Sequence, residues 1–204
     1  MIRNETVAYY DNPDNDYATK TVGADMSHIY PRFLKYLPEN SSLLDVGCGS
    51  GRDSLYFLKN GYAVTSIDSS LKMCEYAEQL LQQPVLHQNF EDIDYQECFN
   101  GIWACASLLH VQEQNMCNVL RKLFAALVDG GVLYASWKLG DHERIEPSTG
   151  RLFCDMSEER IFTILAPIDR ISVCELWISD DVRGNFRGQS WLNIIVKKCV
   201  NEKI

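Results

Sequence analysis

The chain has 204 residues, the length of one globular domain. Its hydrophobic fraction of 46% and charged fraction of 23% exclude disordered, collagen-like and coiled-coil classes. The net charge of −9 disfavours nucleic acids and anionic membranes as partners. No apolar run approaches the roughly 20 residues of a membrane span, and the N-terminus lacks an apolar signal segment, so we expect a cytoplasmic monomer or homodimer. The 8 cysteines include no Cys-x-x-Cys pair, so we expect neither a metal site nor a disulfide framework.

The predicted elements begin with an N-terminal cover and helix over residues 1–38. Turn formers and tyrosines fill residues 9–17, which favours a mobile cover over a site or, equally, disorder. Apolar residues at helical spacing predict a helix over Met26–Leu37, which Pro38 closes.

From residue 41 onward, short apolar runs alternate with amphipathic segments, a pattern typical of βαβ units and a parallel sheet. The predicted strands are Ser42–Val46, Ala63–Ile67, Pro84–His87, Gly101–Ser107, Gly131–Trp137, Ile171–Ile178 and Trp191–Lys198. The predicted helices between them are Gly51–Lys59, Ser70–Gln82, Gln112–Leu127 and Ser157–Ala166. An irregular stretch over residues 140–156 precedes the last helix, and loops of this length are usually functional or disordered. We therefore predict one α/β domain over residues 1–204.

The most specific motif is a glycine loop at the end of the first predicted strand, Asp45-Val46-Gly47-Cys48-Gly49-Ser50-Gly51. Alternate glycines let the backbone turn sharply and let a ligand approach main-chain N–H groups. A dinucleotide fingerprint needs its third glycine at position 52, where this chain has Arg52. The carboxylate of Asp45 would repel a pyrophosphate but suits a positively charged ligand such as S-adenosylmethionine. A structural turn without a ligand is the alternative.

A second carboxylate, Asp68, follows the next predicted strand. It lies 17 residues after Gly51, which matches the acidic residue that accepts hydrogen bonds from ribose hydroxyls. Taken alone, Asp68 could equally be the N-cap of the following helix. Two carboxylates at neighbouring strand ends together favour one ligand between them.

These motifs resemble the class I S-adenosylmethionine-dependent methyltransferases. The resemblance rests on Leu43–Asp53, Ile67–Ser70 with Met73, Phe99–Val111 and Leu127–Tyr134. The tail, with Gly150–Phe153 and Trp191–Asn193, is similar to a small stand-alone bacterial branch of that family. The resemblance implies a doubly wound, Rossmann-like, seven-stranded and mainly parallel sheet with helices on both faces and an antiparallel last strand.

The resemblance also implies where S-adenosylmethionine binds. The cofactor-binding residues carried over from the family pattern are Asp45, Gly47, Cys48, Gly49, Gly51, Arg52, Asp68, Ser69, Met73, Asn89, Phe90 and Ser107. Among them, the glycines surround the methionine part, Asp68 takes the ribose, and Met73 lies against the adenine. Asn89 stands where many members have an aspartate, and its side-chain oxygen can still engage the adenine amino group. Arg52 either pairs with the cofactor carboxylate or covers the helix start.

Methyl transfer needs mainly orientation and exclusion of water, because the leaving group departs neutral. His110, after the fourth strand, is the candidate base, with a structural helix-start role as the alternative. Tyr10, Tyr17 and the stretch 140–156 are predicted to close over the acceptor. Arg144 and Arg151 suggest a small anionic acceptor, although paired surface arginines are the alternative.

We therefore predict a methyltransferase that acts on a small molecule. The alternatives are a tRNA or protein methyltransferase, or a regulatory module that binds the cofactor without transferring a methyl group. A nicotinamide-dependent dehydrogenase is disfavoured by Arg52.

Overall fold

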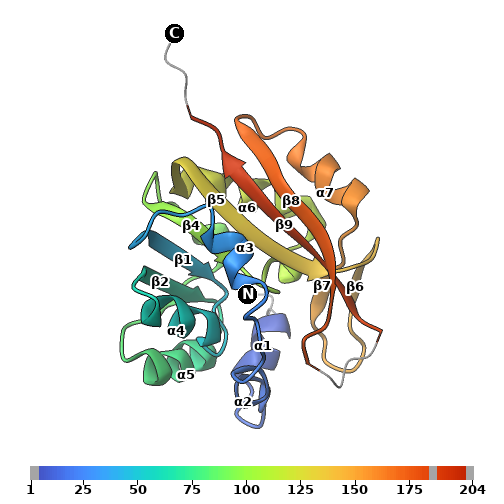
Figure 1. Cartoon of the computed structure of the whole chain (residues 1–204). Helices are drawn as coiled ribbons and strands as arrows, with labels where there is room; N and C mark the ends of the chain where they lie inside the picture. Colours follow the sequence, from blue (N-terminus) through green and yellow to red (C-terminus); the bar gives the residue numbers. More distant parts are fainter. Residues whose placement is uncertain (1–4, 184–187, 201–204) are drawn as a thin grey trace.

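A seven-stranded sheet forms the centre of the part of the chain that the computed structural model describes, residues 5–183 and 188–200 (Figure 1). In spatial order its strands are β3 (Leu86–His87), β2 (Ala63–Asp68), β1 (Ser42–Val46), β4 (Phe99–Ala104), β5 (Leu127–Lys138), β9 (Ser190–Lys198) and β8 (Ile171–Asp180). Strand β9 is antiparallel to both of its neighbours, and the other pairs are parallel. The strand order reverses between β1 and β4, which places a ligand crevice beyond the carboxyl ends of these strands.

Helices cover both faces of this sheet, as predicted. Neighbouring residues of one strand point to opposite faces, so Leu43 packs with α3 (Tyr30–Leu34) and α4 (Arg52–Lys59), whereas Leu44 packs with α6 (Glu113–Ala126) and α7 (Glu158–Leu165). Helix α5 (Leu71–Leu81) packs against α4. The alternation of buried apolar residues on the central strands therefore produces a three-layer α/β domain.

The ends of several predicted strands are displaced in the structure, and those of β3, β4 and β5 illustrate this. Strand β4 begins at Phe99 and ends at Ala104, because Ala106 adopts a left-handed conformation with φ of 52° and turns the chain out of the sheet. Strand β5 begins at Leu127, which pairs with Phe99 ahead of a register shift. Strand β3 keeps only two residues.

The helix predicted over Met26–Leu37 is wrong in its length. Only Tyr30–Leu34 is α-helical, and Pro31 occupies its first turn, where a missing N–H group is tolerated. The residues before it form turns, beginning with the Ser27 N–H group, which donates to the Asp25 carboxylate at 2.9 Å. The apolar periodicity still has a cause, since Met26, Ile29, Tyr30 and Phe33 are all buried in one cluster.

The N-terminal segment forms two short helices rather than an irregular stretch, α1 (Glu5–Asp11) and α2 (Tyr17–Thr21); residues 1–4 of the predicted cover lie outside the described residues. Both ends of α1 are tied to the body of the domain. The Leu152 N–H group donates to Thr6 Oγ1 at 2.9 Å, and the Ser70 hydroxyl donates to the Asp11 carboxylate at 2.7 Å.

The stretch 140–156 is likewise more regular than predicted. It contains a hairpin of β6 (Glu143–Ile145) and β7 (Leu152–Cys154), which forms a separate two-stranded sheet. A short 3-10 helix, η2 (Leu108–His110), follows β4. Its last residue, His110, donates a hydrogen bond to the Leu152 carbonyl at 2.7 Å. The hairpin and α1 therefore meet beyond the carboxyl ends of the central strands. No helix in the described ranges is long and apolar enough to cross a membrane.

Candidate functional site

A cavity of about 580 Å³ lies at the carboxyl ends of the parallel strands. The glycine loop after β1, Asp68 at the end of β2 and the segment after β4 line one part of it. Residues of α1, α2 and β7 line another part, and the facing ends of β8 and β9 close a third. This is the edge at which an open, doubly wound sheet binds its ligand.

The glycine loop is bound to the end of β2. The N–H groups of Gly47 and Cys48 both donate to the Ile67 carbonyl, at 2.9 and 3.0 Å. The Gly49 N–H group donates to Asp68 Oδ2 at 2.8 Å, while the Ser70 N–H group donates to Asp68 Oδ1 at 2.9 Å. Asp68 thus joins the loop to the chain before α5, whereas the N-cap of α5 is Ser70, whose hydroxyl accepts from the Met73 N–H group at 3.1 Å.

Asp68 also carries charge that the protein leaves unneutralised. Burial raises the pKa of this carboxyl group above its ordinary value, although its two backbone donors oppose the shift. Among the described residues it has no ion pair with a lysine or arginine. Each carboxylate oxygen has lone pairs beyond its one backbone bond. A ligand that brings hydroxyl donors, as a ribose does, fits this wall of the cavity.

Most of the predicted cofactor residues gather around this wall. Those that line the cavity are Gly47, Cys48, Gly49, Arg52, Asp68, Ser69, Met73, Asn89, Phe90 and Ser107. Two further observations fit a bound nucleoside. The buried Ser107 Oγ has no hydrogen-bond partner within the described part of the chain. A Cβ atom built on Gly49 would meet no atom within 4 Å, so the cavity reaches this backbone directly.

Asp45 and Gly51 do not line the cavity, contrary to their predicted place around the ligand. The Asp45 side chain is buried beneath the loop and accepts a hydrogen bond from Ser54 Oγ at 2.5 Å. Burial raises its pKa, and the nearby charge of Asp53 adds to the shift. Gly51 faces α5, because a Cβ atom there would stand 3.1 Å from Ala77 Cβ. Both residues build the loop rather than touch its contents.

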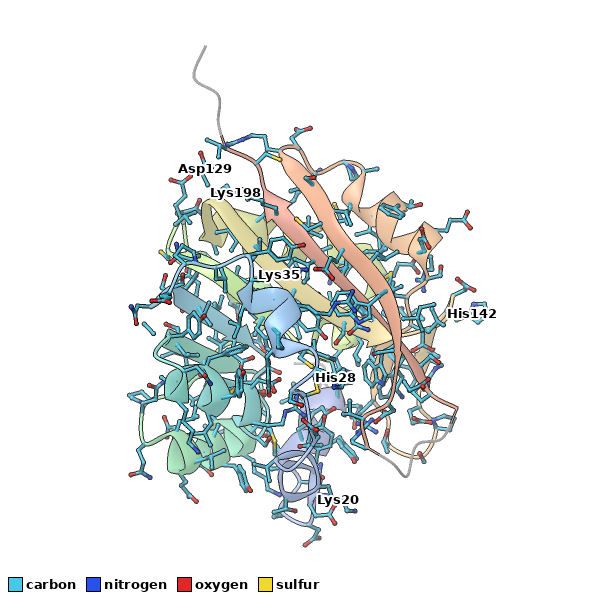
Figure 2. All side chains as sticks on the ribbon, viewed as in Figure 1. Lys20, His28, Lys35, Asp129, His142 and Lys198 are labelled. Carbon is cyan, nitrogen blue, oxygen red and sulfur yellow. The ribbon has the colours of Figure 1, made fainter. Side chains whose placement is uncertain are left out.

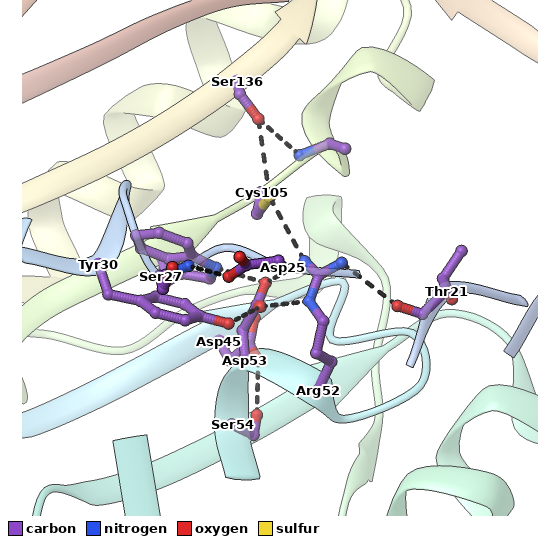
Figure 3. Close-up of polar contacts among 12 residues, drawn as sticks. Thr21, Asp25, Ser27, Tyr30, Asp45, Arg52, Asp53, Ser54, Cys105 and Ser136 are labelled. Carbon is purple, nitrogen blue, oxygen red and sulfur yellow. Dashed lines mark hydrogen bonds and ion pairs between the residues drawn. The ribbon is translucent and has the colours of Figure 1, made fainter. Parts of the chain in front are cut away.

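A buried polar network below the cavity was not predicted from the sequence. Asp53 accepts hydrogen bonds from Arg52 Nε at 2.6 Å, from the Tyr30 hydroxyl at 2.7 Å and from the Trp103 indole at 2.8 Å (Figure 3). Burial opposes ionisation, but Arg52 and these donors hold the pKa of Asp53 below its ordinary value. The adjacent Arg52-Asp53 pair was visible in the sequence, but its aromatic partners come from distant segments. Arg52 lines the cavity with its charge already paired.

His110 and Tyr10 form a second network on the other side of the cavity. His110 Nδ1 lies 2.7 Å from the Leu152 carbonyl, which can only accept, so Nδ1 carries the proton. Its Nε2 therefore accepts from the Tyr10 hydroxyl at 2.9 Å, and Arg151 Nη1 donates to the same hydroxyl at 3.2 Å. Burial lowers the pKa of His110 to about 4. The imidazole is neutral near pH 7, and both of its nitrogens are engaged.

The predicted acceptor residues separate into two groups. Tyr10, Tyr17, His110 and Arg151 line the cavity, whereas Arg144 does not. Arg144 instead donates from Nε to Asp155 Oδ2 at 2.9 Å, the surface pairing that was its alternative role. The other histidines, His28, His87 and His142, are exposed, and Figure 2 shows His142 at the periphery of the molecule.

Lys138 is a cavity residue that sequence reasoning missed. It ends β5, and its Nζ lies 3.9 Å from the centre of the Phe153 ring. Burial lowers the pKa of its ammonium group, and the charge of Arg144 adds to the shift. Its place after an apolar strand was the available signal, since such strand ends meet at the ligand edge.

Comparison with known proteins finds similar sequences and folds. Residues 43–131 match the family model described as a methyltransferase domain. The Bacillus subtilis protein named "Putative methyltransferase YqeM" is 30% identical over an alignment of 166 residues that covers 72% of this chain and 65% of the relative. The match thus spans less than two thirds of the length of that curated relative.

Solved structures share the fold. A methyltransferase from Methanosarcina mazei superposes with a TM-score of 0.72 at 21% identity, covering 85% of this chain and 99% of that one. The Burkholderia thailandensis 1,6-didemethyltoxoflavin-N1-methyltransferase, solved with its substrate and S-adenosylhomocysteine, superposes with a TM-score of 0.74 at 20% identity, covering 95% of this chain and 88% of that one. With the glycine loop and the sheet order, these findings show a likeness to methyltransferase domains over residues 43–131 and a fold shared with S-adenosylmethionine-dependent methyltransferases.

Proposed function

We propose that this protein transfers the methyl group of S-adenosylmethionine directly to a small-molecule acceptor. The observation that carries the proposal is the division of the cavity into two differently built parts. One part has the glycine loop and the unneutralised Asp68, and the other has Tyr10, Tyr17 and Arg151. The first part suits a nucleoside, and the second leaves room for an acceptor beside it.

The cofactor-binding part is proposed to hold S-adenosylmethionine with its ribose hydroxyls on Asp68. Met73 and Phe90 are buried apolar residues of the lining and suit the flat adenine ring. Asn89 is exposed, and its amide nitrogen donates to Asp92 at 2.9 Å, so its oxygen remains an acceptor for an adenine amino group. When bound, S-adenosylmethionine supplies an electrophilic methyl group on a positively charged sulfur.

The small size of the acceptor is inferred from the way the cavity is closed. Among the described residues, the short elements α1, α2 and the β6–β7 hairpin cover the acceptor part beside the ends of β8 and β9, and the whole cavity, cofactor part included, measures about 580 Å³. Ligand pockets for small molecules span roughly 300–1,000 Å³. The net charge of −9 disfavours tRNA, which would call for a basic stripe. The toxoflavin-type structural neighbour, whose name states a small heterocyclic substrate, supports the same size class.

The residues of the acceptor part are proposed to orient the acceptor rather than to abstract its proton. His110 holds the Tyr10 hydroxyl through Nε2, and its low pKa makes it a weak base. The protein's part would be to hold the acceptor lone pair in line with the cofactor's methyl group, which needs no basic side chain. A proton carried by the acceptor atom would be released to solvent after the transfer. Exclusion of water by α1 and Tyr17 completes this role.

The proposal is tested by calorimetry with S-adenosylhomocysteine and by transfer of a labelled methyl group. Labelled S-adenosylmethionine is incubated with the protein and with cell extract separated into small molecules, RNA and protein. We expect label in the small-molecule fraction. Label in RNA or protein would show that the acceptor class is wrong. Tight cofactor binding with no labelled product in any fraction would favour the alternative, a binding module without transfer.

A further inference from the structure

Two cations that line the acceptor part of the cavity lie near one aromatic ring. The Lys138 Nζ lies 3.9 Å from the centre of the Phe153 ring, and the Arg151 Cζ lies 5.0 Å from it. The Arg151 guanidinium also lies over Tyr9, with Cζ 4.2 Å from that ring centre. Lys138 at the end of β5 and Arg151 just before β7 therefore bring two positive charges close to Phe153.

Neither cation is neutralised by the protein. Throughout residues 5–183 and 188–200, neither Lys138 nor Arg151 forms an ion pair with a carboxylate. The side-chain hydrogen bonds of Arg151 go to uncharged oxygens, the Tyr10 hydroxyl and Thr149 Oγ1, each at 3.2 Å. His110, which is neutral near pH 7, does not balance the charge of either cation.

The nearby acidic side chains, Asp155 and Glu146, contact a different arginine, Arg144. Asp155 accepts from Arg144 Nε at 2.9 Å, and Glu146 Oε2 lies 3.9 Å from Arg144 Nη1. Glu146 also lines the cavity, and the charges of both Asp155 and Glu146 reach Lys138 without forming an ion pair with it in the described part of the chain. Half-buried cations without a counter-charge are costly, and a negatively charged ligand group would offset that cost. An acidic protein that keeps two unpaired cations here has a specific use for them.

We propose that Lys138 and Arg151 bind an anionic group, a carboxylate or a phosphate, of the methyl acceptor. This inference rests on the proposed function, because it identifies the substrate class of the same site. The planar fork of Arg151 matches both anions, and Lys138 adds a point charge. Phe153, which lies near both, adds apolar surface to this part of the lining. The cofactor's own carboxylate would have a separate cation beside the glycine loop, Arg52, which also lines the cavity.

The test compares the binding of three probes that share a phenyl ring and differ in the attached group and its charge. Benzoate, phenyl phosphate and the neutral benzamide are titrated into the full chain, with and without saturating S-adenosylhomocysteine, and binding is followed by calorimetry or NMR. We expect at least one anion to bind the wild type ten times more tightly than benzamide. The preference for benzoate or for phenyl phosphate distinguishes the two anions. In Lys138→Met and Arg151→Met the preference falls below threefold, and Arg151→Lys restores part of it.

Two controls separate this inference from its rivals. Lys59→Met removes a positive charge from the exposed end of α4, outside the lining, and should keep the full preference. S-adenosylhomocysteine should bind all four variants within threefold of the wild type. Equal binding of anions and benzamide to the wild type would overturn the inference. A loss of S-adenosylhomocysteine affinity in both Lys138→Met and Arg151→Met would overturn the inference too, because these two cations would then hold the cofactor. The readout is binding, so failure to transfer methyl groups would refute the proposed function separately.

Discussion

Substituting Gly51 by alanine should damage the fold while leaving cofactor binding intact. Gly51 has φ of 76°, and a side chain in that left-handed region costs about 1–2 kcal/mol. Its new Cβ atom would stand 3.1 Å from Ala77 Cβ and 3.3 Å from Ala77 Cα, and such overpacking costs about 1–3 kcal/mol. The free energy of unfolding should fall by roughly 2–5 kcal/mol. For a domain of this size, the melting temperature should fall by on the order of 10 °C.

Gly49→Ala is the matched comparison within the same loop. Its φ of 53° carries a similar backbone cost of about 1–2 kcal/mol, but its Cβ atom would enter open space. That space belongs to the cavity, so the new methyl group should obstruct the ligand's approach to the backbone. We expect S-adenosylhomocysteine affinity to fall by at least about tenfold, or 1.4 kcal/mol. Gly51→Ala should change this affinity by less than about threefold.

Two measurements separate the effect on stability from the effect on ligand affinity. Thermal unfolding of both variants without ligand gives the stability, and calorimetric titration of S-adenosylhomocysteine at a temperature where both are folded gives the affinity. Ala77→Gly introduced with Gly51→Ala removes the nearest contact and should recover part of the lost stability beyond the sum of the single changes. The reasoning fails if Gly49→Ala is as unstable as Gly51→Ala, or if Gly51→Ala weakens ligand binding as much as Gly49→Ala does.

The other predictions concern buried polar groups. Asp68→Asn should weaken S-adenosylhomocysteine binding by about tenfold to a hundredfold, since hydrogen bonds to charged groups are worth about 1.5–3 kcal/mol, and unchanged affinity by calorimetry would remove Asp68 from the cofactor site. Tyr30→Phe deletes the 2.7 Å bond to the buried Asp53 and should cost about 1–3 kcal/mol by urea unfolding, whereas Tyr56→Phe, whose ring stacks on Tyr30, should cost less. His110 has a folded pKa of about 4, below its ordinary value of about 6.5, so its contribution to stability is complete above pH 6.5 and is lost as the pH falls toward 4. Between pH 7.5 and 5, the free energy of unfolding of His110→Gln, measured by urea unfolding, should therefore fall by about 2 kcal/mol less than that of the wild type. Equal falls in the two proteins would contradict the burial of a neutral imidazole.

Local patterns in the sequence were sufficient for the sheet and for the cofactor half of the cavity. Strand and helix periodicities depend on neighbouring residues, so the seven strands and the helices between them were predicted, with errors mainly at their ends. The glycine loop and Asp68 were also predicted, because parallel strands that share an edge bring their carboxyl ends together. The exception is Met26–Leu37, where apolar spacing was read as one helix although Pro31 limits the helical part to a few residues.

The acceptor half of the cavity was decided by the tertiary structure. Arg144 lies on the β6–β7 hairpin, and it does not face the cavity because it donates to Asp155, the residue after β7. The bond between Tyr10 and His110 joins residues 100 positions apart, and no local pattern encodes it. The acidic composition likewise says nothing about two unpaired cations in one place. The sequence by itself determined the fold and the place of the glycine loop, since both depend on short-range spacing; the charge and shape presented to the acceptor arise only where distant segments pack together.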